Sequence, residues 1–124
     1  MNKKTVLIID DEVAFTEMVK LNLEASGRFI VKIENNPHLT VSTALSCLPD
    51  VILLDVVMPD IEGPDVIGMF RKEPLLCDIP IIFLTATIRK TEAQGDDGVI
   101  GGHLFLAKPC SVDELIQAID SKTW

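Results

Sequence analysis

The chain has 124 residues, of which 48% are hydrophobic and 24% are charged, and its formal net charge at pH 7 is −8. This length and composition predict a single packed domain over residues 1–124 and exclude a disordered chain. The acidic balance and the lack of a basic cluster argue against direct binding of nucleic acid. The longest apolar runs fall far short of the roughly 20 residues that cross a bilayer, and the first residues do not resemble a secretory leader. We therefore expect a cytoplasmic protein that has no membrane segment.

Short apolar runs alternate along the chain with stretches in which apolar residues follow helical spacing. The apolar runs lie at residues 5–9, 29–33, 51–54, 79–84 and 103–107. Helical spacing is clearest in residues 13–25 and 112–119. Five strands that alternate with five helices predict an α/β fold with a doubly wound parallel sheet, because parallel strands need crossover connections. Helices would then cover both faces of the sheet.

Local signals predict where several helices begin and end. Gly27 follows the first helix at a position that favours a left-handed residue. Asn36 and Pro37 resemble a cap and a first helical residue, and Ser111 with Glu114 forms a capping-box pattern before the last helix. Four apolar residues of the first helix are expected to face the core: Val13, Met18, Leu21 and Leu23.

Polar residues follow four of the predicted strands. Asp10 and Asp11 come after the first strand and Asp55 after the third. Thr85 follows the fourth strand and Lys108 follows the fifth. In an open, doubly wound sheet, ligands bind beyond the carboxyl ends of the strands, so these side chains are expected to share one crevice. Three carboxylates there would suit a hard divalent cation, and Mg²⁺ is the natural candidate.

The chemistry of these side chains predicts a role for each. Carboxylates attack phosphoryl groups to give aspartyl phosphates, and the transfer depends on positioning and charge neutralisation. Asp55 is then the acceptor, Asp10 and Asp11 hold the metal, and Lys108 and Thr85 contact phosphoryl oxygens. Any one of these acids alone could equally be a helix cap or the end of a strand. The combination of acids, hydroxyl and amine carries the interpretation.

Four motifs, in this order and spacing, resemble those of response regulator receiver domains, and the chain is similar to the single-domain chemotaxis regulators over essentially its whole length. The motifs are IIDDE at 8–12, DVVMPDIEG at 55–63, LTA at 84–86 and FLAKP at 105–109. The resemblance implies a flavodoxin-like strand order 2-1-3-4-5. It also implies two-component signal transduction, in which a histidine kinase or histidine phosphotransfer protein supplies the phosphoryl group and small acyl phosphates can substitute. The domain would catalyse its own phosphorylation and slow dephosphorylation without being an enzyme toward other substrates.

The resemblance adds residues to the predicted site. The metal ligands that it implies are Asp10, Asp11, Asp55 and the backbone carbonyl of Val57. Thr85 and the aromatic Phe105 would act as the switch, which repacks the face formed by the fourth helix, fifth strand and fifth helix. Val57 and Thr87 occupy the positions that tune release of the phosphoryl group. Because a valine side chain cannot orient water by hydrogen bonding, we expect a long-lived phosphorylated state.

Other interpretations of the sequence have less support or are left open. A haloacid dehalogenase type of hydrolase would need a second aspartate two residues after the acceptor, where Val57 stands. An interaction module that keeps the receiver fold but is never phosphorylated remains the main alternative. The sequence does not indicate the downstream protein partner, and a homodimer that forms on phosphorylation is left open.

Overall fold

The strands of the protein form one large sheet and one small hairpin. The computed structural model describes residues 3–55, 57–58, 61–62, 68–85, 99–100, 103–107 and 111–123. The large sheet has the order β2-β1-β3-β6-β8-β7. Its strands are β1 (Lys4–Ile9), β2 (Phe29–Glu34), β3 (Val51–Asp55), β6 (Ile81–Thr85), β7 (Val99–Ile100) and β8 (His103–Ala107). The hairpin pairs β4 (Val57–Met58) with β5 (Ile61–Glu62).

The long strands of the sheet are parallel, as the alternation of strand and helix predicts. β1 pairs in parallel with β2 and with β3, β3 pairs with β6, and β6 pairs with β8. The prediction of a doubly wound parallel α/β fold is thus confirmed. The expectation of five strands misses β7, a short strand that adds to β8 in the antiparallel sense at the edge of the sheet. The helix expected between the fourth and fifth long strands falls on residues 86–98, which lie outside the described residues.

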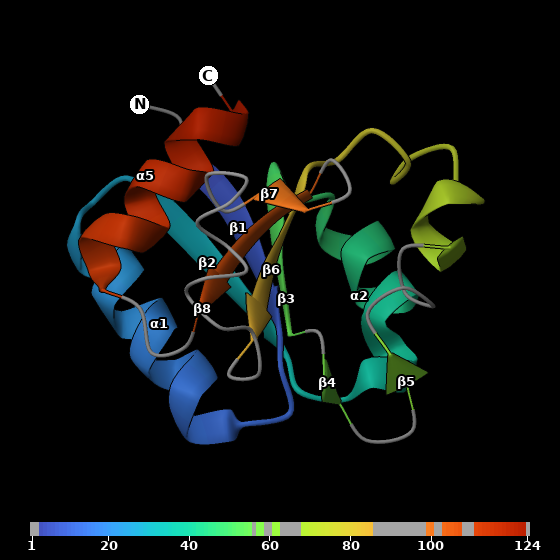
Figure 1. The fold of residues 1–124 in the computed structure, drawn as a ribbon, viewed down its shortest axis with the longest axis horizontal. Coiled ribbons are helices and arrows are strands. Elements are labelled where there is room, and N and C mark those ends of the chain that lie inside the picture. The colour runs from blue at the N-terminus through green and yellow to red at the C-terminus, as the bar shows by residue number, and fades with distance from the viewer. Residues whose placement is uncertain are drawn as a thin grey trace.

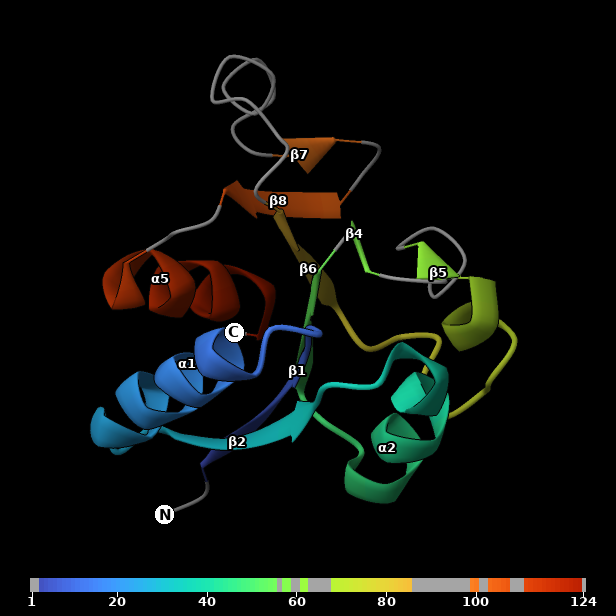
Figure 2. The same ribbon diagram turned by 90° about the horizontal axis from the view of Figure 1, so that it is seen from below.

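Helices cover both faces of the sheet. The named helices are α1 (Val13–Ala25), η1 (Pro37–Leu39), α2 (Thr40–Cys47) and α5 (Val112–Thr123), and residues 68–71 are also helical. Figure 2 shows α1 and α5 on one face and α2 on the other. Because side chains alternate across a strand, Val6 and Ile8 pack toward α1 and α5, whereas Leu7 and Ile9 pack on the side of α2. Burial on both faces explains why β1 is an unbroken apolar run.

The buried face of α1 differs from the one expected. Thr16, Val19 and Leu23 are its buried residues, which follow the spacing of three and four that one helix face requires. Leu23 was predicted correctly, whereas three residues expected in the core are exposed: Val13 (52%), Met18 (44%) and Leu21 (71%). Thr16 can be buried because its hydroxyl donates to the backbone carbonyl of Val13 at 2.9 Å.

The predicted helix caps are present. The backbone N–H of Glu114 donates to Ser111 Oγ, and the N–H of Ser111 donates to Glu114 Oε1, both at 3.1 Å. These reciprocal bonds are the capping box. Asn36 Oδ1 accepts the N–H of His38 at 2.9 Å, so Asn36 is a cap and Pro37 begins a helical turn. That turn is 3₁₀, and the α-helix begins only at Thr40.

Left-handed residues end both α1 and α2. Gly27, with φ of 77°, follows α1 as predicted, and its N–H donates to the carbonyl of Glu24 at 3.0 Å. At the end of α2 the same conformation is taken by Leu48, with φ of 42°. A residue with a Cβ adopts this conformation at a cost, so a leucine at position 48 does not predict it.

We expect Gly27→Ala to lower the free energy of unfolding by about 1–2 kcal/mol, because alanine is strained at this positive φ. No other atom lies within 4 Å of the Cβ that alanine would add, so the effect is conformational. Gly68 offers the matched control, since it lies in a helical segment and its added Cβ also meets open space. Gly68→Ala should leave stability unchanged or raise it by up to about 1 kcal/mol. Urea unfolding of both variants measures the difference between their stabilities. Equal midpoints would contradict the left-handed conformation of Gly27.

Candidate functional site

Two neighbouring strands bring the acids together. β1 and β3 run side by side in the same direction, with Ile9 opposite Leu54, so their carboxyl ends share one edge of the sheet (Figure 1). Each of Asp10, Asp11 and Asp55 offers a carboxylate oxygen, and these oxygens all lie within 4.8 Å of one another. Asp10 and Asp55 are buried, at 0% and 5% exposure, whereas Asp11 is exposed. Two acids of the cluster, Asp10 and Asp55, are therefore shielded from solvent, and the cluster is open to solvent at Asp11.

Backbone and side-chain hydrogen bonds hold the turn from β1 into α1. The N–H of Asp10 donates to the carbonyl of Glu34 at 3.2 Å, which extends the pairing with β2 by one residue. Asp10 Oδ1 accepts the N–H of Glu12 at 2.9 Å, and this bond orients the carboxyl group. The N–H of Thr16 donates to the carbonyl of Glu12 at 3.1 Å, at the start of the helix. Buried Asp10 therefore lies in a turn that these hydrogen bonds hold in one conformation.

The sequence interpretation missed Asn35, which also contacts this turn. Its side-chain Nδ2 donates to the carbonyl of Asp10 at 2.8 Å and to Thr16 Oγ1 at 3.0 Å. The residue follows β2 and is half-buried. An asparagine after a strand is also an ordinary turn residue, so nothing in its sequence position distinguishes it.

The chemistry of the acids fits a hard divalent cation. Such ions prefer oxygen ligands, and carboxylates that converge within a few ångströms repel one another unless a positive charge lies between them. The open side at Asp11 would let an ion keep some of its water, as Mg²⁺ commonly does. Asp10, Asp11 and Asp55 are therefore the residues that could hold the metal.

The remaining predicted site residues are described only in part. Thr85 is the last residue of β6, next to β3, and it pairs with Ala107 at the end of β8. The backbone of Thr85 is thus at the same edge of the sheet as Asp55. The following parts of the predicted site lie outside the described residues: Lys108 and Thr87, and the side chains of Val57, Thr85 and Phe105.

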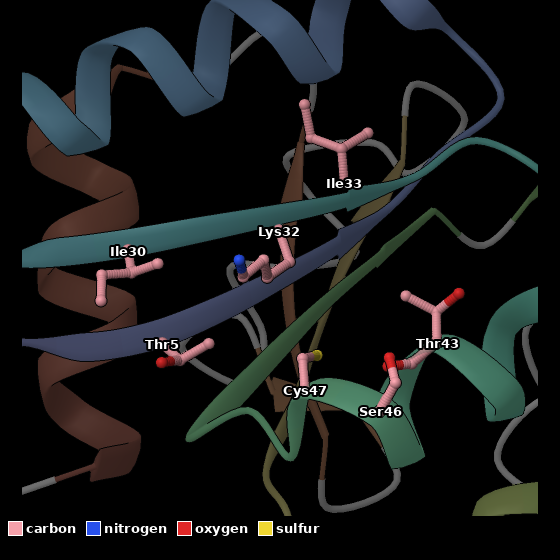
Figure 3. A pocket seen from close by; sticks show the side chains of 7 residues that line it. All are labelled: Thr5, Ile30, Lys32, Ile33, Thr43, Ser46 and Cys47. Atoms are coloured by element: carbon pink, nitrogen blue, oxygen red, sulfur yellow. The ribbon is translucent and has the colours of Figure 1, made fainter.

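A groove lies elsewhere, between β2 and α2 (Figure 3). It has a volume of about 420 Å³ and is lined by Thr5, Ile30, Lys32, Ile33, Thr43, Ser46 and Cys47. None of the clustered acids lines it. Burial raises the pKa of the Cys47 thiol, and the charge of Lys32 opposes this effect in part. The thiol is therefore protonated at neutral pH.

Comparison with known protein families identifies the family of the chain. A family model described as the response regulator receiver domain matches residues 6–120. The chain belongs to this family. Receiver domains are the parts of two-component response regulators that typically take up a phosphoryl group on an aspartate.

Curated relatives of this receiver domain include transcriptional regulators. It is 34% identical over 114 residues to the phosphate regulon transcriptional regulatory protein PhoB of Pseudomonas aeruginosa, a match that covers 91% of the chain and 48% of PhoB. It is 32% identical to the DNA-binding dual master transcriptional regulator RpaA of Synechocystis, a match that covers 92% of the chain and 46% of RpaA. The receiver domain thus spans about half the length of these relatives.

Solved structures agree with this fold. The chemotaxis protein CheY4 of Vibrio cholerae has a TM-score of 0.82 and 25% identity, with 98% of this chain and 99% of CheY4 covered. A response regulator from Desulfuromonas acetoxidans has a TM-score of 0.79 and 27% identity, with 95% and 94% of the two chains covered.

Membership of the family implies histidine kinases as partners. Within the described residues, no helix is long and apolar enough to cross a membrane.

Proposed function

We propose that this receiver domain takes up a phosphoryl group on Asp55 from a histidine kinase or a histidine phosphotransfer protein. The domain catalyses the transfer to itself, and the reaction depends on Mg²⁺. One observation carries the proposal: the carboxylates of Asp10, Asp11 and Asp55 converge within 4.8 Å at the carboxyl edge of the parallel sheet. Ligands of doubly wound folds bind at this edge.

In this proposal Asp55 is the acceptor because it ends β3 and opens the motif DVVMPDIEG (55–63), which resembles the phosphoacceptor motif of the family. Its side chain is only 5% exposed, at the end of β3, so few water molecules compete for the incoming phosphorus. One carboxylate oxygen of Asp55 forms the bond to phosphorus, and the donor group leaves with the electron pair of the broken bond. Mg²⁺ would be held by Asp10, Asp11, Asp55 and the backbone carbonyl of Val57. The N–H of Glu12 orients the carboxyl group of Asp10, and Asp11 is exposed. The ion supplies the charge neutralisation that phosphoryl transfer needs.

Lys108 and the Thr85 hydroxyl complete the proposed site by pairing with phosphoryl oxygens. Thr85 and Phe105 form the proposed switch, which alters the surface around β8 and α5. Val57, which cannot orient water, and Thr87 would set the lifetime of the phosphorylated state. The position of Val57 two residues after the acceptor supports its part in this proposal.

The proposal extends to the whole chain. Residues 1–124 form one receiver domain in the cytoplasm, with the strand order 2-1-3-4-5 and five helices that are typical of the family. The parallel order β2-β1-β3-β6-β8 supports this part of the proposal. Output passes to a protein partner or to a second copy of the chain, with no contact between this domain and nucleic acid. The net charge of −8 favours partners that present a basic face.

Intact mass after incubation with acetyl phosphate tests the proposal. We expect the mass of one phosphoryl group to be added to the wild-type protein when Mg²⁺ is present, and none to be added when a chelator removes the metal. An interaction module that is never phosphorylated would show no added mass under either condition. Absence of the adduct at early times and high donor concentration would contradict the proposed function.

A further inference from the structure

The side-chain amide of Asn35 joins three elements next to the acids. It follows β2, and its Nδ2 donates one hydrogen bond to the carbonyl of Asp10 (2.8 Å) and another to Thr16 Oγ1 of α1 (3.0 Å). Both amide hydrogens are therefore used. The Thr16 hydroxyl in turn donates to the carbonyl of Val13 at 2.9 Å, and Thr16 is fully buried. The amide thus ties the end of β1 to the first turn of α1.

The bond to the Asp10 carbonyl acts on Asp11 through the backbone. The carbonyl of Asp10 and the nitrogen of Asp11 belong to one planar peptide group, so fixing the carbonyl fixes the direction in which the chain enters Asp11. On the other side of the turn, Asp10 Oδ1 holds the N–H of Glu12 at 2.9 Å. The exposed acid of the cluster is therefore placed between two anchored peptide groups.

We propose that Asn35, braced by Thr16, is a positioning residue that aligns Asp11 with Asp10 and Asp55 for binding of a divalent cation. The inference rests on the proposed function, because it concerns the metal site of that function. Asn35 touches neither the ion nor the phosphoryl group. An amide suits this place because it donates two hydrogen bonds and adds no further negative charge, whereas a carboxylate could not donate at all.

The expected consequence is a loss of preorganisation. Without the amide, the Asp10–Asp11 peptide would sample more orientations, and binding of the ion would have to restrict them again. Residues that orient metal ligands from outside the coordination shell typically change metal affinity by 10-fold or more. We therefore expect Asn35→Ala to weaken Mg²⁺ binding about 10-fold. Phosphorylation at saturating Mg²⁺ should stay near the wild-type maximum, because the acceptor itself is unchanged.

Titration calorimetry with magnesium chloride on the metal-free protein tests the inference. Asn35→Ala and the isosteric Thr16→Val should both weaken the affinity, whereas Thr16→Ser, which keeps the hydroxyl, should retain most of it. Asn36→Ala is the matched control, because the side chain of Asn36 accepts the N–H of His38, which lies outside the turn from β1 into α1. The double variant of Asn35 and Thr16 should weaken binding by less than the product of the two single effects, because both substitutions remove the hydrogen bond between Asn35 and Thr16.

The possible outcomes separate this inference from the proposed function. If the wild type binds Mg²⁺ and Asn35→Ala binds equally well, the inference is wrong and the proposed function stands. If the wild type binds no Mg²⁺, the proposed function fails and the inference fails with it. If Asn36→Ala weakens binding as much as Asn35→Ala, the effect is general loosening of the loop and the inference is also wrong. Amide hydrogen exchange at Asp11 and Glu12 in the metal-free variants provides an independent readout, because it should be faster in Asn35→Ala than in Asn36→Ala.

Discussion

Asp55→Asn is expected to abolish uptake of the phosphoryl group from acetyl phosphate in the presence of Mg²⁺. The substitution keeps the size and shape of a side chain that is only 5% exposed, so the sheet should fold as before. The amide lacks the anionic oxygen that attacks phosphorus, and it removes one of the three carboxylates that would hold the ion. Intact mass at early and late times measures the loss, which should be complete within detection.

Asp50→Asn is the matched control for this experiment. Asp50 precedes the same strand at its other end, is exposed, and accepts the backbone N–H of Thr5 at 2.7 Å. The same chemical change there should leave uptake at the wild-type level. Uptake that survives in Asp55→Asn, or that is lost equally in Asp50→Asn, would show that Asp55 is not the acceptor.

Leu53→Ala is expected to produce the largest loss of stability, about 2–5 kcal/mol. Leu53 lies in the middle of β3 at 0% exposure, and it belongs to the core cluster that also contains residues of α1 and α5. Truncation removes buried apolar atoms and leaves a cavity that surrounding strands can fill only in part. Domains of this kind are stable by about 5–15 kcal/mol in total, so the urea midpoint should fall by a large fraction.

Leu21→Ala makes the same chemical change on the surface. Leu21 lies on α1 and is 71% exposed, so its truncation should change stability by no more than about 0.5 kcal/mol. Similar losses in Leu53→Ala and Leu21→Ala would contradict the described orientation of α1 and the burial of β3. The comparison also tests the one helix whose buried face the sequence interpretation assigned wrongly.

Features that depend on residues close together in the sequence could be predicted. The capping box of Ser111 and Glu114 and the left-handed Gly27 need only local hydrogen bonds and backbone preferences. The approach of Asp10 to Asp55 is also predictable, because parallel strands end at a common edge whatever the details of packing. Together these signals are enough for the fold class and for the acids of the site.

Features that depend on tertiary packing could not be predicted. Which face of α1 is buried depends on how the helix docks on the sheet, and buried Thr16 shows that a polar residue can lie on that face when its hydroxyl is bonded. Leu48 takes a left-handed conformation that its residue type disfavours. The role we propose for Asn35 depends on contacts with Asp10 and Thr16, 25 and 19 residues away in the chain. No periodic pattern or motif connects these positions.

The most direct test of the central claim is to locate the phosphoryl group on the chain. Wild-type protein is phosphorylated with acetyl phosphate and Mg²⁺, reduced with borohydride, which converts an acyl phosphate to the corresponding alcohol, and digested for tandem mass spectrometry. The account predicts homoserine in place of aspartate at position 55, and only when the metal was present. Homoserine at another aspartate, or at none, would contradict it.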